Sequence, residues 1–597
     1  MRSALFSAAV LSALLLLSIS NPAHAQIVPG APPVAPQQIA PTREEIDRNR
    51  QREAPSAARL KIDGDIERAP CALDSPAYAD IKVTITDAQF NNLQGITPDE
   101  LKASYATLLG TDRPISTICT IRDAAATALR AKGYLAAVQV PVQRIENGVV
   151  RFEVLFAKIV AIRVRGDAGP AEGALQAYMQ HLIDEQVFNR YRAERYLLLS
   201  RDMPGYEVRL ALKPAGTVPG ELVGEISVIR TPLDVNFNAQ NFSSHSSGRW
   251  SGALQAATYG LLGADRLTAS VSSTADFKEQ QIVQFGYDTK LGGEGLTLAG
   301  NFTYAWSKPT LDGAAFTIKA RTLFATGEVR YPWIRTQGFS LVGAAGFDYL
   351  NQTVTYDDGA LAGALSRDKL RVGFLRIDMD AADVPERRAP RWRGSGSIEL
   401  RQGLNILGAS PPSIARPGNP LGPLTPARAD GDRTSTLVRG SASFEYSLGN
   451  GFWIAALPRA QYAFTPLFSF EEYSAGNFTI GRGYDPGVII GDSGVGSGFE
   501  LRLPNTRPFQ KVDLTVLPFA FTDIAWTWQK ASFVDRSPPN PDFVASVGGG
   551  VRAVLNNRFR IDGTVAVPLK RAGLQTHNHD PRFLVSIATK LWPWEDQ

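Results

Sequence analysis

The chain has 597 residues, and because one core rarely grows beyond about 250 to 300 residues, several modules or one very large barrel are expected. Its 62 lysines and arginines against 58 aspartates and glutamates give a formal charge of +4. No basic block stands out, so the charge gives no argument for binding nucleic acid.

The first residues have the composition of a secretory signal peptide. Met1-Arg2 precedes an apolar run from Ala4 to Ile19, and the small residues of Ala23-His24-Ala25 follow. We expect residues 1–25 to be a signal peptide, cleaved before Gln26. No later run of about 18 apolar residues predicts a transmembrane helix, which leaves a periplasmic protein, a secreted protein or a barrel.

Residues 26–70 are rich in proline and polar side chains, a composition that cannot bury a core. They are expected to form a leader and a linker. Within them Thr42-Arg43-Glu44-Glu45 is typical of a capping box and predicts a charged helix over residues 42–53, before Pro55. A helix of this composition has to lie in water or in a polar cavity.

The chain has two cysteines, Cys71 and Cys119. An export signal places them in an oxidising compartment, which favours a disulfide. Closing that loop would stabilise the surrounding domain by roughly 4 kcal/mol in the chain-entropy model. Two unpaired buried thiols are the alternative.

Residues 71–231 mix short strands with helices in an order that repeats once, which predicts two related α+β modules, 71–158 and 159–231. In the first, Thr97-Pro98-Asp99-Glu100 predicts a helix start, and a second helix is expected from Ile118 to Lys132. The remaining expected elements are strands over 134–142, 149–164, 206–213 and 220–230 and helices over 171–183 and 192–201.

From residue 232 to the end the helical period disappears. Phe559, Ile561 and Val565 share one parity, whereas Arg560 and Asp562 take the other. A soluble sandwich also alternates, but a membrane barrel with a polar lumen suits a region of about 360 residues better. Turn signals divide it into about sixteen antiparallel strands, which would enclose an aqueous channel, so a plug is expected.

One loop of this region, residues 466–492, contains Gly481-Arg482-Gly483-Tyr484. On a later strand, parity points Phe521 and Asp523 inward, so we expect Arg482 to meet Asp523. In a wet lumen such a pair would contribute only about 1 kcal/mol, and its value would be positional. The alternative is a polar surface turn with a solvated arginine.

Together these features resemble the TpsB outer-membrane transporters of two-partner secretion, the haemolysin secretion/activation type, within the superfamily that also holds the barrel-assembly insertases. The resemblance rests on Gly133-Tyr134, Pro141-Val142-Gln143, Asn147-Gly148, Glu194-Arg195, Asp202-Met203-Pro204-Gly205, Glu471-Glu472-Tyr473, Gly481-Arg482-Gly483-Tyr484 and Glu500-Leu501-Arg502. The sequence departs from the family at Ala525, where a glycine is usual, and at its end, Glu595-Asp596-Gln597, where an aromatic residue is usual.

The resemblance implies a membrane β-barrel over residues 232–597, preceded by two periplasmic POTRA domains, 71–158 and 159–231. It further implies a loop folded back into the lumen and a pore plugged by helix 42–53, with a plain linker as the alternative for this helix. The implied site residues are Gly481, Arg482, Gly483, Tyr484, Phe521 and Asp523 for the loop contact, and Gly133, Tyr134 and Gln143 for cargo binding.

The resemblance also implies partners and a location. The protein would be a monomer in the outer membrane, inserted there by the barrel-assembly machinery, and would export a secreted exoprotein of the TpsA type. A barrel-assembly insertase is the alternative function, and a passive porin or receptor is disfavoured by the two modules.

Enzymatic chemistry finds little support in the sequence. Gly491-Asp492-Ser493-Gly494 is similar to the nucleophile signature of trypsin-type proteases, but no histidine has a protease context. His577-Asn578-His579-Asp580 lies in an expected loop tip without a third ligand group for a metal. We therefore expect neither an enzyme nor a cofactor or metal.

Overall fold

The computed structural model describes residues 40–48, 70–216, 218–310, 316–357, 359, 362–385, 389–411, 426–428, 430–477, 480–509, 511–530, 542–556, 558–572 and 579–593. The expected signal peptide, most of the leader, residues 49–53 of the expected helix and the last four residues lie outside this set. Within it, no helix is both long and apolar enough to cross a membrane.

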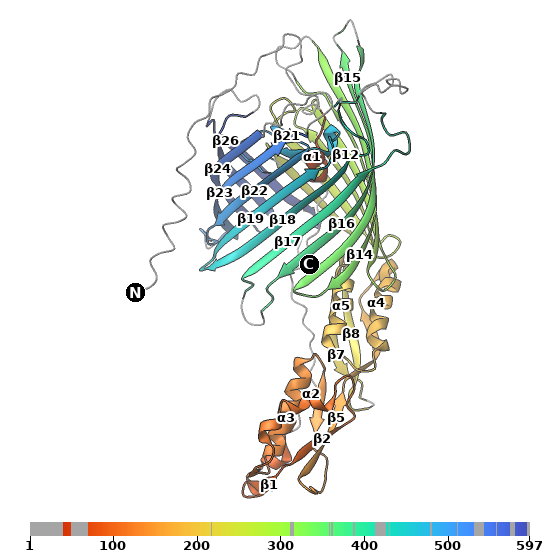
Figure 1. Ribbon diagram of the computed structural model, residues 1–597, viewed down its shortest axis with the longest axis vertical. Helices are drawn as coiled ribbons and strands as arrows, with labels where there is room; N and C mark the ends of the chain where they lie inside the picture. Colours follow the sequence, from red (N-terminus) through yellow and green to blue (C-terminus); the bar gives the residue numbers. More distant parts are fainter. Residues whose placement is uncertain are drawn as a thin grey trace, which may run out of the picture. The chain divides into compact units, whose positions relative to one another are not determined.

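The C-terminal region forms a closed antiparallel barrel of sixteen strands within the described residues (Figure 1). Each strand pairs with its neighbours in chain order, and the last pairs with the first, so the predicted fold class is confirmed. The strands are β9 (Leu233–Gln240), β10 (Ser251–Tyr259), β11 (Asp265–Thr274), β12 (Gln280–Leu291), β13 (Leu296–Ser307), β14 (Thr317–Arg335), β15 (Phe339–Asp357), β16 (Ala362–Ala382), β17 (Trp392–Gly403), β18 (Thr436–Gly449), β19 (Phe452–Ala463), β22 (Ser493–Arg502), β23 (Leu514–Trp528), β24 (Asp542–Leu555), β25 (Phe559–Pro568) and β26 (Arg582–Trp592).

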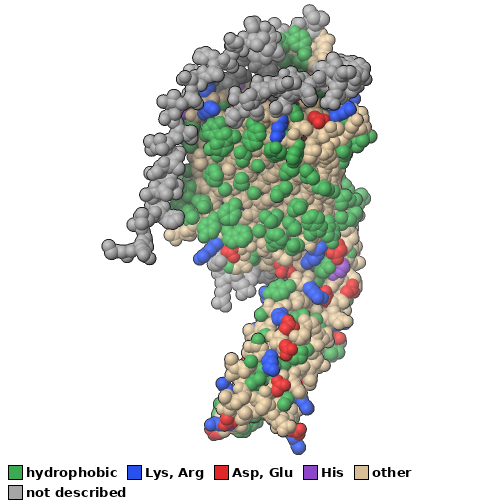
Figure 2. Space-filling view, in the orientation of Figure 1, with side chains coloured by type: hydrophobic (Ala, Val, Ile, Leu, Met, Phe, Trp, Pro, Cys, Tyr) green, Lys and Arg blue, Asp and Glu red, His purple; other side chains and the backbone are tan. Residues whose placement is uncertain are grey.

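The barrel wall is apolar outside and polar inside. On β23, Trp526 is 37% exposed, whereas Asp523 is 1% exposed. Ile561 and Val565 of β25 are exposed as well, as their shared parity predicts. Figure 2 shows the outer face of the strands as a belt of hydrophobic side chains, with charged side chains gathered at its rims. This distribution suits a wall that faces lipid.

The first α+β module is a three-stranded sheet, in the order β2-β5-β4, covered by helix α3. Ile121 and Leu129 of α3 are buried with Phe152 of the sheet. The elements of this module are η3 (Ala72–Asp74), η4 (Pro76–Tyr78), β1 (Lys82–Thr84), β2 (Asp87–Asn91), α2 (Pro98–Lys102), η5 (Ala106–Leu108), β3 (Asp112–Pro114), α3 (Thr117–Ala131), β4 (Ala136–Gln139) and β5 (Val149–Phe156).

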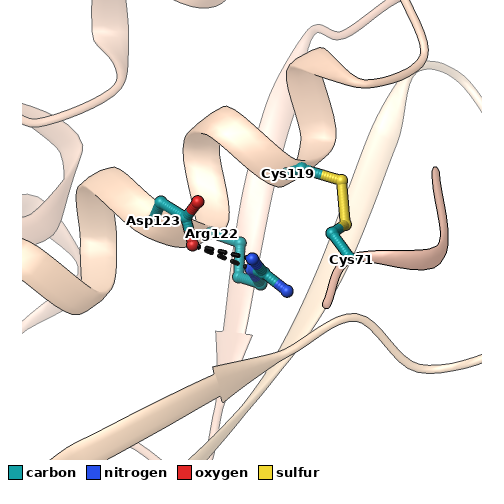
Figure 3. The surroundings of a disulfide bond; sticks show 4 residues. All are labelled: Cys71, Cys119, Arg122 and Asp123. Carbon is teal, nitrogen blue, oxygen red and sulfur yellow. Dashed lines mark hydrogen bonds and ion pairs between the residues drawn. A yellow bond between two sulfur atoms is a disulfide. The ribbon is translucent and has the colours of Figure 1, made fainter. Parts of the chain in front are cut away.

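The two cysteines lie in this module. Cys71, directly before η3, is joined to Cys119 of α3 by a disulfide with a Cα–Cα distance of 6.0 Å (Figure 3). Arg122 and Asp123, one turn further along the helix, form an ion pair with a distance of 2.9 Å beside it. The disulfide thus ties the segment that enters the module to the helix over its sheet.

The second module repeats the topology of the first. Its sheet has the order β6-β8-β7, with the central strand parallel to β6 and antiparallel to β7, as β5 is to β2 and β4. Leu175 of α4 and Leu197 of α5 are buried against this sheet. The elements are β6 (Lys158–Arg165), η6 (Gly169–Ala171), α4 (Glu172–Asp184), α5 (Arg190–Arg201), β7 (Tyr206–Pro214) and β8 (Glu221–Arg230).

Most boundaries differ from the sequence expectation by one to three residues, and the strand expected over 134–142 is shorter, Ala136–Gln139. The strand expected over 149–164 is two strands, because the chain leaves the first sheet at Ala157 and enters the second at Lys158. Helix α5 begins two residues before the expected start, since the Asn189 side chain accepts a hydrogen bond of 3.0 Å from Tyr191 N and caps it.

Candidate functional site

A short polar helix, α1 (Arg43–Arg48), contacts several separate strands of the barrel wall (Figure 1). Arg43 donates to Asp348 of β15 and to Glu471, each at 2.9 Å. Glu44 lies 3.3 Å from Arg459 of β19, and the Ile46 carbonyl accepts from Gln284 of β12 at 3.1 Å. Since β12, β15 and β19 stand apart in the ring, α1 lies in the lumen.

The sequence predicted the start of α1 but missed an apolar contact. Thr42 N donates to Glu45 Oε2 at 2.9 Å, as the predicted capping box requires. Ile46, however, is fully buried in an apolar cluster with six other residues, four from the wall and two from the loop that follows β19: Phe324, Leu350, Leu370, Val372, Phe468 and Phe470. The helix therefore binds the wall through one apolar side chain as well as through its charges.

Arg401 of β17 completes the charge cluster around α1. It is 1% exposed, and it donates to Asp348 Oδ2 at 2.7 Å and to Glu471 Oε2 at 2.8 Å. Glu399 Oε1 accepts a third bond from it at 2.5 Å. Asp348 and Glu471 therefore each pair with both the helix and the wall. No local sequence pattern predicts this arrangement.

The loop between β19 and β22, residues 464–492, which we call the inward loop, is folded against the inside of the wall. It contains η7 (Ser469–Glu471) and a small hairpin of β20 (Tyr473–Ala475) with β21 (Ile489–Gly491). Tyr473, Tyr484 and Ile489 are buried with Ala525 and Val544 of the wall. The inward loop thus carries an apolar face, which packs against the wall and fixes the position of the loop.

Arg482 of the inward loop makes a bidentate contact with Asp523. Its Nη2 lies 2.7 Å from Oδ1 and its Nε 3.0 Å from Oδ2, and its backbone N–H donates to Oδ2 at 2.8 Å. The guanidinium also lies 3.7 Å above the Phe521 ring, a cation–π contact. The structure brings together the residues that the sequence singled out for this contact.

Glu500 of β22 is a further partner that the sequence reasoning did not assign. Arg482 Nη1 donates to its Oε1 at 2.7 Å, and Arg552 of β24 donates to the same atom at 2.9 Å. Glu500 alternates with the apolar Phe499 and Leu501, so the parity of its strand is the signal that could have found it. The arginine therefore bridges two neighbouring strands, β22 and β23.

The carboxylate of the contact is buried, unlike the solvated pair assumed from the sequence: Asp523 is 1% exposed, whereas the Arg482 side chain is 18% exposed. Asp523 also accepts from Gly481 N at 3.3 Å, so several donors surround a carboxylate that is almost fully buried. Removing one member of a buried pair typically costs about 3 to 5 kcal/mol, because the other charge stays unpaired. The estimate of about 1 kcal/mol for a solvated pair therefore does not apply to this geometry.

The flanking residues let the loop approach the wall closely. Gly481 has a φ of +108°, which favours glycine, and a Cβ at Gly483 would lie 2.8 Å from the Cβ of Ser546. The Tyr484 hydroxyl lies 2.7 Å from the carbonyl oxygens of both Ala545 and Lys570. Each residue of Gly481-Arg482-Gly483-Tyr484 thus contributes to the contact with the wall. The glycines allow a close approach of the backbone, and Arg482 and Tyr484 form hydrogen bonds.

Asp492, from the motif similar to a protease signature, makes structural contacts. It is fully buried, accepts from Leu467 N at 2.6 Å and Lys530 N at 2.7 Å, and pairs with Arg428. It therefore joins three loops at one end of the barrel.

The candidate residues of the first module make internal contacts. Gly133 has a φ of +88° and ends α3, and the Tyr134 hydroxyl donates to Gly95 O at 2.8 Å. The Gln143 amide bonds to both N and O of Arg151, each at 2.7 Å. The structure brings Gly133 and Tyr134 next to the start of α5, whereas Gln143 lies against β5.

Residues 381–553 match the family described as haemolysin secretion/activation protein ShlB/FhaC/HecB, and this segment includes both Arg482 and Asp523. The predicted resemblance to the TpsB transporters is confirmed. The family is one of protein transporters, not of enzymes, and it implies the outer membrane and a secreted partner protein.

Two solved structures share the fold of this chain. CdiB from Escherichia coli matches with a TM-score of 0.68 and 16% identity over 88% of this chain and 94% of that chain. CdiB from Acinetobacter baumannii matches with a TM-score of 0.60 and 15% identity over 92% and 96% of the two chains. At these identities the likeness concerns the fold. No curated protein matches the chain in a sequence comparison.

Proposed function

We propose that the protein exports a large secreted partner protein of the TpsA type through its barrel, from the periplasm to the cell surface. The observation that carries this proposal is the buried contact of Arg482 with Asp523, within the segment that matches the secretion family. The contact holds the inward loop against the lumen wall, so its release changes the space through which a chain passes.

Helix α1 is the plug of the resting pore in this proposal. Its hold on the wall is polar apart from Ile46, and Arg401 pairs with both carboxylates that Arg43 uses. When α1 withdraws, those carboxylates keep a cationic partner. The free-energy cost of removing such a plug is lower than that of removing one whose departure would leave buried charges unpaired.

The two α+β modules, 71–158 and 159–231, are the periplasmic POTRA domains in this proposal, and they receive the unfolded cargo. Each sheet has three strands and therefore two edge strands. In this proposal an extended segment of the cargo pairs with one of these edges as an additional strand. Gly133, Tyr134 and Gln143 are the candidate residues of the first module for this contact. Gly133 and Tyr134 support it by their place beside the start of the second module.

The deciding experiment measures export of the large protein encoded beside this gene. Wild type is compared with Arg482→Ala and Asp523→Ala at matched outer-membrane levels, with Arg507→Ala, an exposed arginine on the turn before β23, as the control. Loss of export in the first two variants only supports the proposal. Normal export in them overturns the role of the contact.

The same experiment addresses the insertase alternative. If depletion of the protein leaves export unchanged but lowers the amounts of other barrels in the outer membrane, the protein is an insertase and the proposal fails.

A further inference from the structure

The barrel closes where β26 pairs with β9, and this seam has the shortest ladder in the ring. Among the described residues it contains six partner pairs, from Ser586↔Gln240 to Trp592↔Val235, with a register shift near its end. The neighbouring ladders, β9 with β10 and β25 with β26, contain eight pairs each. The seam is therefore the junction with the least backbone pairing.

A side chain extends the seam beyond its ladder. Asn241 directly follows β9, and its backbone N–H donates to Val585 O at 3.1 Å. Its amide group donates to Phe583 O at 2.8 Å and accepts from Val585 N at 2.7 Å. The Asn241 amide thus pairs with β26 as a further peptide unit would, at the end of the seam where the inward loop lies.

The inward loop contacts both sides of the seam at this end. Asn477 Nδ2 donates to the carbonyl of Phe242, the residue after Asn241, at 2.7 Å. Asp485 Oδ1 lies 2.9 Å from Nη1 of Arg582, the first residue of β26, whose side chain is 10% exposed. One loop therefore holds the end of the first strand and the start of the last.

The route of the loop explains how it reaches the seam. Arg482 is fixed on Asp523 of β23, Gly483 N donates to Ser546 Oγ of β24 at 3.3 Å, and Tyr484 contacts the carbonyl of Ala545 on the same strand. The contact of Asp485 with β26 continues this series in the order of the ring, whereas Asn477, which precedes Arg482 in the chain, reaches the residue after β9 from the other side of the fixed point. The contact of Arg482 is thus the fixed point from which the loop crosses the wall to the seam.

We propose that the inward loop is a clasp for the barrel seam, in which Asn477 and Asp485 hold the ends of β9 and β26 side by side. This role requires no cargo and stands apart from the export function. It makes the seam conditional on the loop: when the loop leaves the wall, both contacts are lost together, and the short ladder and Asn241 carry the junction.

The test is hydrogen exchange of the purified full-length protein, read by mass spectrometry. In the double variant Asn477→Ala with Asp485→Asn, the amides of residues 235–241 and 582–589 should exchange about tenfold faster, the effect expected when one hydrogen bond and one ion pair no longer oppose local opening. Those of β10 to β11 and β18 to β19 should be unchanged. Asp430→Asn, which removes a charge from the Arg428 cluster instead, is the matched control.

Unchanged exchange at the seam, or an equal increase in every strand, overturns the clasp. If the double variant does not insert, Asp485→Asn alone is measured, with the same expected sites of change. A disulfide engineered at the facing positions, with Asn238→Cys and Ala588→Cys, should cancel the increase, and its failure to do so also overturns the clasp.

Export of the partner protein is measured on the same variants. A seam effect with normal export supports the clasp and leaves the pore proposal standing. Loss of export without a seam effect overturns the clasp alone, so failures of the two proposals are distinguishable.

Discussion

Arg43 of α1 and Arg401 of β17 donate to the same two carboxylates, those of Asp348 and Glu471. One arginine belongs to a helix that lies in the lumen, and the other belongs to the wall. Because both carboxylates are buried, each needs a cation at all times, and Arg401 supplies it whether or not the helix is present. The two arginines should therefore respond very differently to mutation.

Replacement of Arg43 should free the helix without harming the barrel. Arg43→Ala removes two hydrogen bonds from α1 while Asp348 and Glu471 keep Arg401, so we expect a higher open probability in planar-bilayer recordings and nearly unchanged urea unfolding of the barrel. Arg507→Ala, on an exposed turn, is the control. A conductance equal to that of wild type would show that Arg43 does not retain the helix.

Replacement of Arg401 should instead destabilise the barrel. Arg401→Ala leaves Glu399 and the two shared carboxylates with fewer cations in a buried site, and we expect a loss of about 3 to 5 kcal/mol in the free energy of unfolding. Urea unfolding of the purified barrel, followed by tryptophan fluorescence, measures it. If Arg43→Ala costs as much as Arg401→Ala, the wall and helix arginines are equivalent and the argument fails.

A lysine at position 482 should not reproduce the contacts of Arg482. An ammonium group cannot make the bidentate contact with Asp523 and reach Glu500 at the same time. We expect Arg482→Lys to lower barrel stability by about 1 to 3 kcal/mol, since buried partners of Asp523 are lost. The measurement is the temperature at which the folded band on a gel is lost, with Arg507→Lys as the control. Equal temperatures for Arg482→Lys and wild type would contradict it.

The sequence predicted the contact of Arg482 because the information was local. Parity placed Asp523 on the inner face of its strand, and the resemblance supplied the inward fold of the loop that brings Arg482 to it. The burial of Asp523 was not predictable in this way. The loop beside it packs Tyr473, Tyr484 and Ile489 against the wall, and that packing depends on how the whole loop folds.

The charge cluster around α1 shows the other limit of sequence reasoning. Arg43 and Asp348 are separated by 305 positions and Arg43 and Glu471 by 428. No periodicity connects residues on a leader helix, a strand and a loop. The capping box predicted that the helix exists, but only the closed ring determines which carboxylates face it.

The disulfide should stabilise the first module alone. Cys71 and Cys119 are 48 positions apart, and a loop of this size corresponds to roughly 4 kcal/mol in the chain-entropy model. We expect Cys71→Ser with Cys119→Ser to make residues 71–158 sensitive to protease while the barrel keeps its heat resistance. The wild-type protein under reducing conditions should behave like the double variant. Equal protease resistance in all three samples would contradict the prediction.

The first module should also lose stability in acid through Glu100. A hydrogen bond from Lys132, and a second from the Thr97 backbone, lower the pKa of Glu100 from 4.5 to about 2. A carboxyl with a lowered folded-state pKa contributes stability above its unfolded value, and this contribution disappears as the pH falls from 4.5 toward 2. Glu100→Gln should therefore unfold at the same temperature as wild type near pH 2 and at a lower temperature near pH 7. Hydrogen exchange monitors the unfolding of the module between pH 2 and pH 7 and measures the difference in unfolding temperature between the two proteins. Glu172→Gln on α4 is the control. A gap between wild type and Glu100→Gln that stays constant with pH would assign the effect to packing instead of charge.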